Sequence, residues 1–180
     1  MPNYRRYRQL GGTFFFTVNL RDRRTPLLVQ RIDLLRGAVE RVKSDHPFQI
    51  DAAVILPEHL HMIWTLPHDD DDYSTRWRLI KSRFSSGMRG VIDTTPISTS
   101  RKHKKECGIW QRRFFEHTIC DDLDYAQHVD YIHFNPVKHG HADRPVDWPY
   151  SSIHRYIAEG ILTPDWGTSG VQPEDLGYND

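Results

Sequence analysis

Four short stretches rich in apolar residues have the length and pattern of strands. In the first, residues 13–20, apolar side chains at alternate positions share one face. That face consists of Phe14, Phe16, Val18 and Leu20. The other strands are predicted at residues 48–56, 59–66 and 109–119. Pro57 and Glu58 alone separate the second strand from the third, which suits a tight connection.

Apolar residues at helical spacing occupy the segments between and after these strands. The first helix is predicted over residues 27–45, with a proline just beyond its end. The second lies within residues 68–88, where a run of aspartates suits the positive end of a helix. The third covers residues 121–134 and starts with two aspartates close to a capping box. A short fourth helix is predicted around residues 151–159.

The resulting order, β-α-β-β-α-β-α, predicts an α+β fold with a ferredoxin-like antiparallel sheet. The 180 residues are enough for one domain with a sizeable core. We expect this domain to cover residues 1–155 and a C-terminal tail to follow at 156–180. A polar, basic loop is predicted at residues 91–108.

The net charge is zero, but the charges are divided unevenly along the chain. Residues 1–113 hold 21 Lys and Arg against 12 Asp and Glu, a balance of +9, and residues 114–180 hold 3 against 12, a balance of −9. This asymmetry favours a surface that binds a polyanion, although an uneven solvated surface would look the same. No stretch reaches the ~18 to 20 apolar residues of a membrane span. Two cysteines give no disulfide framework, and we expect a reduced, cytosolic protein.

A His-X-His pair lies inside the third predicted strand. Alternation places His59 and His61 on one face, opposite the apolar side chains of Leu60 and Met62. Two imidazoles about 7 Å apart along a strand can bind one divalent ion. Such a pair also arises by chance in a chain with eleven histidines. Two ligands do not complete a site, and Glu58 would point to the opposite face of a regular strand, so we expect the third ligand elsewhere in the sequence.

The third predicted helix carries a tyrosine among polar residues. Gln127, Tyr131 and Asn135 follow one another at intervals of four, which predicts an exposed Tyr131 on a polar face. Pro136 predicts that the helix ends at Asn135. Most tyrosines only pack against other side chains. Together with a metal-binding histidine pair and a basic half-chain, however, this one suits phosphodiester cleavage by a tyrosine nucleophile.

Several motifs in this sequence match a known family in the family's order. They are YRR (4–6), GGTFFFTVNL (11–20), VILPEHLHMIWTLP (54–67), STRWRLIKSRF (74–84), IWQRRFFEHTI (109–119), HVDYIHFNPVKHG (128–140) and DWPYSS (147–152). With these motifs the chain resembles the REP-associated tyrosine transposases, a branch of the single-tyrosine, HUH-type transposases of small bacterial insertion sequences. The resemblance covers about residues 4–155 and implies the HUH nuclease fold. It also implies that His59, His61 and Asn135 bind a divalent metal ion, Mg²⁺ or Mn²⁺, and that Tyr131 is the nucleophile.

The resemblance further implies a substrate and a reaction. The family cleaves and rejoins single-stranded DNA through a 5′-phosphotyrosine intermediate, and the expected target is a REP-type hairpin. The expected assembly is a monomer or a homodimer. Candidate DNA-binding residues are Arg5, Arg6, Arg8, Arg21, Arg23, Arg24, Arg112, Arg113 and Lys138. By alternation, Arg112 and Arg113 would face opposite sides of the fourth strand.

Three other functions fit part of this pattern. The first is a catalytically silent protein that binds REP hairpins or structured RNA, for which charge and aromatic residues suffice. The second is an HUH enzyme of rolling-circle replication or plasmid transfer, but the chain has no YXXXY spacing and no GxxxxGK[ST] phosphate loop. The third is a metal-dependent hydrolase that activates water and forms no covalent protein–DNA species.

Overall fold

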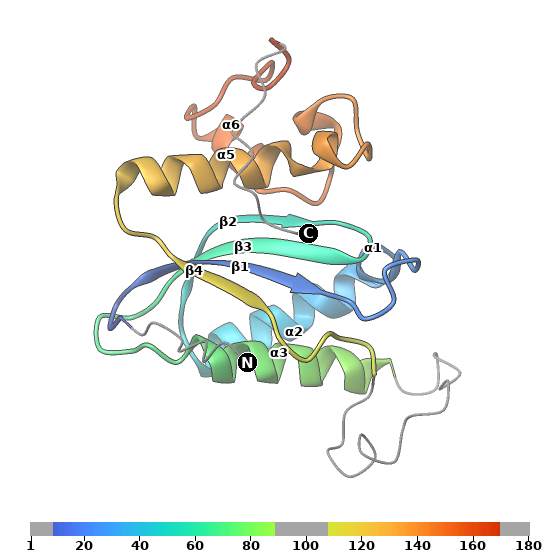
Figure 1. Cartoon of the computed structure of the whole chain (residues 1–180), viewed down its shortest axis with the longest axis vertical. Coiled ribbons are helices and arrows are strands. Elements are labelled where there is room, and N and C mark those ends of the chain that lie inside the picture. The colour runs from blue at the N-terminus through green and yellow to red at the C-terminus, as the bar shows by residue number, and fades with distance from the viewer. Residues whose placement is uncertain (1–8, 89–107, 170–180) are drawn as a thin grey trace, which may run out of the picture.

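The computed structural model of the chain describes residues 9–88 and 108–169 (Figure 1). Three of the candidate arginines, Arg5, Arg6 and Arg8, lie outside the described residues. So does nearly all of the predicted loop at 91–108. None of the described helices is long and apolar enough to cross a membrane.

The centre of the fold is a four-stranded antiparallel sheet. Its strands are β1 (Thr13–Asn19), β2 (Gln49–Ile55), β3 (His59–Thr65) and β4 (Phe115–Thr118). They lie in the order β2-β3-β1-β4. Strand β3 therefore lies between β1 and β2, and β1 lies between β3 and β4, with antiparallel pairing throughout. The predicted α+β class and ferredoxin-like antiparallel sheet are confirmed.

Helices cover both faces of this sheet (Figure 1). On one face lie α2 (Ile32–Asp45) and α3 (Tyr73–Gly87), which also pack against each other. On the other face α5 (Asp122–Lys138) lies across β2 and β3, with α6 (Ile153–Ala158) beside it. Two short elements, α1 (Leu27–Gln30) and the 3₁₀ helix η1 (Pro145–Asp147), complete the described helices.

The apolar stripes read from the sequence meet on the α2–α3 face. The predicted inner faces of β1 and β3 form this core with the stripe of α3. Its aromatic centre is Trp64 stacked on Trp77, with ring centroids 4.2 Å apart and an angle of 14° between the planes. Helix starts are capped as predicted, because Asp72 accepts the N–H of Thr75 at 3.0 Å and Asp121 accepts that of Asp124 at 2.9 Å.

The second face of the sheet is also buried, which the sequence did not predict. Its apolar cluster joins strand residues to α5 and α6. The members are Phe15, Ala52, Val54, Leu56, Ile63, Val129, Tyr131, Ile132 and Tyr156. The Tyr156 hydroxyl donates to the carbonyl of Asp51 at 3.0 Å. Helix α6 therefore crosses the expected boundary between residues 155 and 156 and packs on the sheet.

Three element bounds differ from prediction. The helix predicted over 27–45 is interrupted at Arg31, whose φ of −121° is not helical. The fourth strand pairs only over Phe115–Thr118, so Arg112 and Arg113 precede it and are both exposed. Helix α5 continues through Pro136 to Lys138, although proline removes one helical hydrogen bond, and Pro136 is buried against the fold.

Candidate active site

The two histidines of β3 lie side by side on the face that α5 covers. Both are fully buried, at 0% exposure, and their ring centroids are 4.9 Å apart. Across the ladder, β1 places Asn19 opposite His59 and Thr17 opposite His61. Strand alternation therefore puts both imidazoles on one face, and the helix above them excludes bulk water.

Each imidazole is held through its Nδ1 atom. His61 Nδ1 lies 2.9 Å from Thr17 Oγ1, and His59 Nδ1 lies 3.0 Å from Glu58 Oε1. A hydrogen bond at one ring nitrogen fixes the tautomer and presents the lone pair of the other nitrogen to a metal. The Nε2 atom of His59 is buried and makes no hydrogen bond within the described residues, as expected for a nitrogen that binds an ion.

Glu58 orients His59, although the sequence predicted that its side chain would point away. Strand β3 begins at His59, so Glu58 lies in the preceding turn and its carboxylate reaches the neighbouring ring. Arg23 lies 3.4 Å from the same oxygen. The hydrogen bond from His59, opposed by partial burial and helped by Arg23, lowers the pKa of Glu58 to about 2. The charged carboxylate favours a proton on Nδ1 of His59 and so leaves Nε2 for an ion.

Tyr131 is buried against the histidine pair, and the prediction that it is exposed was wrong. Only 3% of its surface is accessible, because the face of α5 that carries it packs on the sheet. Its ring meets His61 edge to face, with centroids 5.3 Å apart and planes at 74°. Phe15 of β1 contacts both rings, with its centroid 6.0 Å from that of Tyr131 and stacked on His61 at 5.5 Å. The nucleophile predicted from α5 and the histidines predicted from β3 are therefore neighbours.

Lys138 lies beside Tyr131 near the end of the same helix. Its Nζ atom is 3.4 Å from the Tyr131 hydroxyl and 4.8 Å from the centroid of the ring. The basic end of α5 suits the negative end of the helix dipole. The lysine thus places a positive charge next to the oxygen that would attack a phosphate.

Asn135 follows Tyr131 by one helical turn and shares its face. It is fully buried, at 0% exposure, and neither Oδ1 nor Nδ2 has a hydrogen-bond partner within the described residues. An unsatisfied buried carboxamide costs stability, and an ion or a water molecule bound to it would remove that cost. Two imidazole nitrogens and one amide oxygen, all withdrawn from water, fit a divalent cation.

Five of the candidate arginines lie in two described segments that meet at one end of the sheet. Arg21, Arg23 and Arg24 follow β1, and Arg112 and Arg113 precede β4; all five are exposed. Backbone hydrogen bonds join the two segments, from Arg21 N to Ile109 O at 2.8 Å and from Gln111 N to Asn19 O at 3.0 Å. A further bond from Leu20 N to Glu58 O, at 2.8 Å, brings this end of the sheet to the start of β3. The arginines therefore lie at the end of the sheet that carries His59.

These arginines differ in their partners. The guanidinium of Arg24 is held by Asp22, with Nε 2.9 Å from Oδ1, which makes Arg24 the weakest DNA-binding candidate. Arg113 instead lines a hollow of about 300 Å³ together with Asn19, Gln111, Phe114 and Phe115. Phe115 is 41% exposed and borders the same hollow. Arg113 and Phe115 thus offer a cation and an aromatic surface to one ligand.

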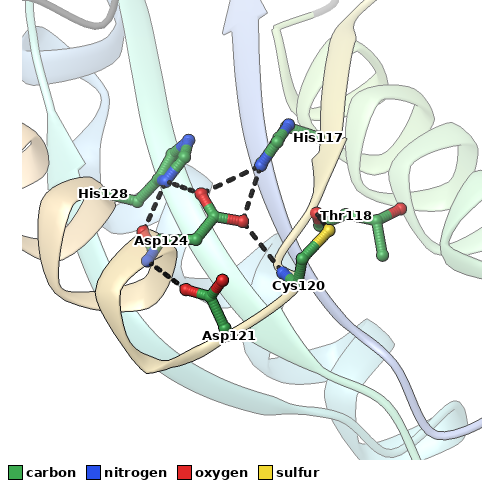
Figure 2. Close-up of polar contacts among 6 residues, drawn as sticks. All are labelled: His117, Thr118, Cys120, Asp121, Asp124 and His128. Carbon is green, nitrogen blue, oxygen red and sulfur yellow. Dashed lines mark hydrogen bonds and ion pairs between the residues drawn. The ribbon is translucent and has the colours of Figure 1, made fainter.

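A second histidine cluster was missed in the sequence. His117 of β4 and His128 of α5 both contact the carboxylate of Asp124 (Figure 2). The spacing of Asp124 and His128, four residues apart on one helical face, was a usable signal. The sequence contains no comparable signal that Thr17 and Glu58 hold the two imidazoles. The contact of Thr17 depends on the pairing of β1 with β3, and that of Glu58 depends on where β3 begins.

No protein-family model matches the chain. A REP-associated tyrosine transposase of Escherichia coli (strain K12) is 49% identical over 169 residues, which cover 92% of this chain and 91% of that protein. A Haemophilus influenzae protein with a provisional description in the same family is 42% identical over 167 residues, covering 93% and 94% of the two chains. A solved structure of a REP-associated tyrosine transposase bound to a REP hairpin has a TM-score of 0.83 and 46% identity, covering 100% of this chain and 98% of that one.

Proposed function

The chain belongs to the REP-associated tyrosine transposases, and from that premise we propose that it cleaves and rejoins single-stranded DNA at REP-type hairpins through Tyr131. The observation that carries the proposal is the contact between Tyr131 and His61, whose rings lie 5.3 Å apart although the residues are far apart in the sequence. A tyrosine beside an oriented imidazole and a lysine supports nucleophilic attack on a phosphate.

The proposed substrate is a folded single strand. The hairpin bound in the related solved structure supports this assignment, and so do the exposed arginines at the His59 end of the sheet. Arginines suit the phosphates of the stem, and these contacts fix the register of the DNA without reading its sequence. An unpaired base beside the stem would stack on Phe115, since stacking on aromatic side chains is how proteins hold unpaired bases.

His59, His61 and Asn135 would hold a divalent ion, Mg²⁺ or Mn²⁺. The unpartnered buried atoms of His59 and Asn135 and the engaged Nδ1 atoms of both histidines support this assignment. A bound divalent ion polarises a non-bridging phosphate oxygen and neutralises charge that develops on it. Thr17 and Glu58 hold the two rings in orientation, and Glu58 adds a negative charge that favours a cation nearby.

Tyr131 performs the transfer itself. Its hydroxyl loses a proton, its oxygen bonds to the scissile phosphorus, and the bond from phosphorus to the 3′ oxygen breaks. The 3′ oxygen leaves as a hydroxyl after taking up a proton, and the 5′ phosphate remains on the tyrosine. Because the phosphodiester is exchanged and not hydrolysed, a 3′-hydroxyl can later reverse the step and rejoin the strand. Lys138 covers the Tyr131 ring, so binding of the DNA must displace the lysine or recruit its charge to the phosphate.

The test is a covalent-adduct assay. The full chain is incubated with a labelled single-stranded REP-type hairpin and Mg²⁺ or Mn²⁺, denatured, and examined for a protein–DNA species. We expect the adduct with the wild type and none with Tyr131→Phe or His61→Ala. Tyr125→Phe is the matched control, because Tyr125 lies on the same helix but its hydroxyl faces Tyr156 at 3.4 Å, and it should form the adduct normally.

The other functions predict different outcomes. Cleavage without an adduct, retained in Tyr131→Phe, would indicate a hydrolase that uses activated water. Tight hairpin binding with neither cleavage nor adduct would indicate a catalytically silent binder. An adduct that persists in Tyr131→Phe would show that another residue is the nucleophile.

A further inference from the structure

A second group of metal-binding side chains joins β4 to the start of α5. Among the described residues, His117, Asp124 and His128 place one donor atom each within 4.8 Å of one another. Figure 2 shows the carboxylate of Asp124 between the two imidazoles, which come from the strand and from the helix. The group is separate from the histidine pair of β3 and takes no part in the reaction proposed for Tyr131.

The contacts within this group are short and mutual. His117 Nε2 lies 2.9 and 3.0 Å from the two oxygens of Asp124, and His128 Nδ1 lies 2.9 Å from Oδ1. The two imidazole rings are stacked, with centroids 4.7 Å apart and an angle of 13° between them. The three donors therefore lie together in a small volume beside the edge strand β4.

These separations suit a tetrahedral ion. Ligands about 2.0 Å from a tetrahedral Zn²⁺ lie about 3.3 Å from one another. The observed separations of 2.9 Å and up to 4.8 Å bracket that value, so small side-chain rotations would bring all three donors into place. Two imidazoles with one carboxylate favour zinc-like transition metals over Mg²⁺, which prefers oxygen ligands and water.

The protonation states also suit metal binding. Burial raises the pKa of Asp124, but hydrogen bonds from His117 and from the Cys120 N–H outweigh it, and the net pKa lies below the ordinary value. Burial lowers the pKa of His128, although contacts with Asp124 oppose that shift. At neutral pH the group thus offers a charged carboxylate and a neutral His128 ring. The Nδ1 atom of that ring donates its proton to the Asp124 carbonyl oxygen, so an ion bound at Nδ1 would displace this proton.

We propose that His117, Asp124 and His128 form a second metal site, for a transition-metal ion of the Zn²⁺ class, that fastens β4 to α5. An ion at this site would stabilise a short edge strand, because β4 has four residues and pairs with β1 at the edge of the sheet. It also lies one helical turn before Tyr131, and Phe15 contacts both His128 and Tyr131, at 4.8 and 6.0 Å between centroids. An ion here would hold the helix that carries the nucleophile in place on the sheet.

In the absence of an ion the same side chains form a hydrogen-bonded clip. Asp124 accepts the backbone N–H of Cys120 at 2.8 Å, and His128 Nδ1 lies 2.7 Å from the carbonyl oxygen of Asp124 (Figure 2). A clip of this kind stabilises the contact between β4 and α5 without any metal. A metal site and a clip therefore make different predictions for ion binding, and binding is the quantity to measure.

The experiment counts bound ions. The full chain is stripped of metal with a chelator and dialysed against micromolar Zn²⁺, and zinc per chain is measured for the wild type, His117→Gln and His154→Gln. His117→Gln removes one imidazole from a partly exposed strand position and keeps a polar side chain of similar length. His154 is exposed and lies outside both histidine clusters, which makes His154→Gln the control for nonspecific loss.

We expect His117→Gln to bind one zinc fewer per chain than the wild type and His154→Gln to match the wild type. Zinc should also raise the melting temperature of wild type by several degrees more than that of His117→Gln, since an ion bound only to the folded chain stabilises it. Asp124→Asn should repeat the loss, and Co²⁺ in the wild type should give the strong visible absorption of a tetrahedral site. Equal zinc content in the wild type and a folded His117→Gln would overturn the proposal and leave the clip. So would equal zinc-dependent stabilisation of the two.

Discussion

The ammonium nitrogen of Lys138 lies 3.4 Å from the hydroxyl of Tyr131, and it also lies 4.8 Å above the ring of that tyrosine. Both contacts come from one helix whose last turn continues through Pro136. Had α5 ended at Asn135, as the proline predicted, the lysine would not have been fixed in this position. A cation next to a phenol favours its ionised form, which is the form that attacks phosphorus.

Lys138→Met should therefore slow adduct formation at saturating hairpin by about 100- to 1,000-fold, the range found when one electrostatic stabiliser is removed from an active site. Lys138→Arg should recover part of the rate because it restores the charge. The measurement is the single-turnover rate of adduct formation. Lys43→Met removes an exposed lysine of α2 and should leave the rate unchanged. A variant that loses hairpin affinity but keeps its saturating rate would show that Lys138 only contacts DNA.

Thr17→Val should weaken metal binding while leaving the nucleophile in place. Valine has the shape of threonine but cannot share the 2.9 Å hydrogen bond with Nδ1 of His61, so the ring loses its fixed orientation. Loss of such a partner typically costs about 10- to 100-fold in metal affinity. The Mn²⁺ concentration that gives half-maximal adduct formation should rise accordingly.

Thr13→Val is the matched control for this prediction. Thr13 lies on the same strand and points to the same face, and its hydroxyl bonds to that of Thr65 at 2.8 Å, away from the histidines. It should change stability slightly and Mn²⁺ dependence not at all. Identical Mn²⁺ dependence in both valine variants and the wild type would show that Thr17 does not orient a metal ligand.

Arg113→Ala should reduce the salt dependence of hairpin binding. Each phosphate that a cation neutralises contributes about 0.7 to 0.9 to the slope of log K against log salt, so removal of one contact should lower the slope by that amount. Arg24→Ala should have a smaller effect, because Asp22 already neutralises that guanidinium at 2.9 Å. The slopes come from hairpin titrations between low and moderate salt. Equal slopes for the wild type and Arg113→Ala would remove Arg113 from the DNA interface.

Strand alternation and helical spacing were enough to predict the sheet and its first core. The faces of β1 and β3 and the stripe of α3 were assigned correctly because long apolar side chains mark those positions directly. The pairing of His59 with His61 followed from the same alternation. These features depend only on which residues of one strand or helix share a face, and a periodic sequence pattern shows this directly.

The second face of the sheet could not be predicted in the same way. The side of α5 that packs there carries His128, Tyr131 and Asn135, so its pattern is that of a solvated surface. These polar residues are buried because α5 packs on apolar strand residues, among them Phe15 and Ile63, and those partners lie far away in the sequence. Tertiary packing likewise keeps Pro136 within the helix, against its local preference.

His133 ties α5 to the rest of the second face and should make stability depend on pH. It is fully buried, its Nε2 lies 2.9 Å from Ser152 Oγ, and the same oxygen accepts the N–H of Ala53 at 2.9 Å. Burial lowers the pKa of His133 to about 3, and nearby Arg155 and His154 lower it in the same direction. The unfolded chain, with an ordinary histidine pKa of about 6.5, therefore binds a proton before the folded chain does.

The sign of the effect follows from linkage. Between pH 6.5 and 3 the unfolded chain binds more protons at this residue than the folded chain does. The free energy of unfolding therefore decreases as the pH falls through this range. As the pH falls from 7.5 to 5, protonation of His133 in the unfolded chain lowers the free energy of unfolding by about 2 kcal/mol. His133→Gln keeps a polar contact to Ser152 but does not titrate. The stability advantage of the wild type over this variant, measured by urea unfolding, should shrink by about that amount over the same interval. A constant difference between the two proteins at pH 7.5 and 5 would show that His133 takes up its proton as readily in the folded chain as in the unfolded one.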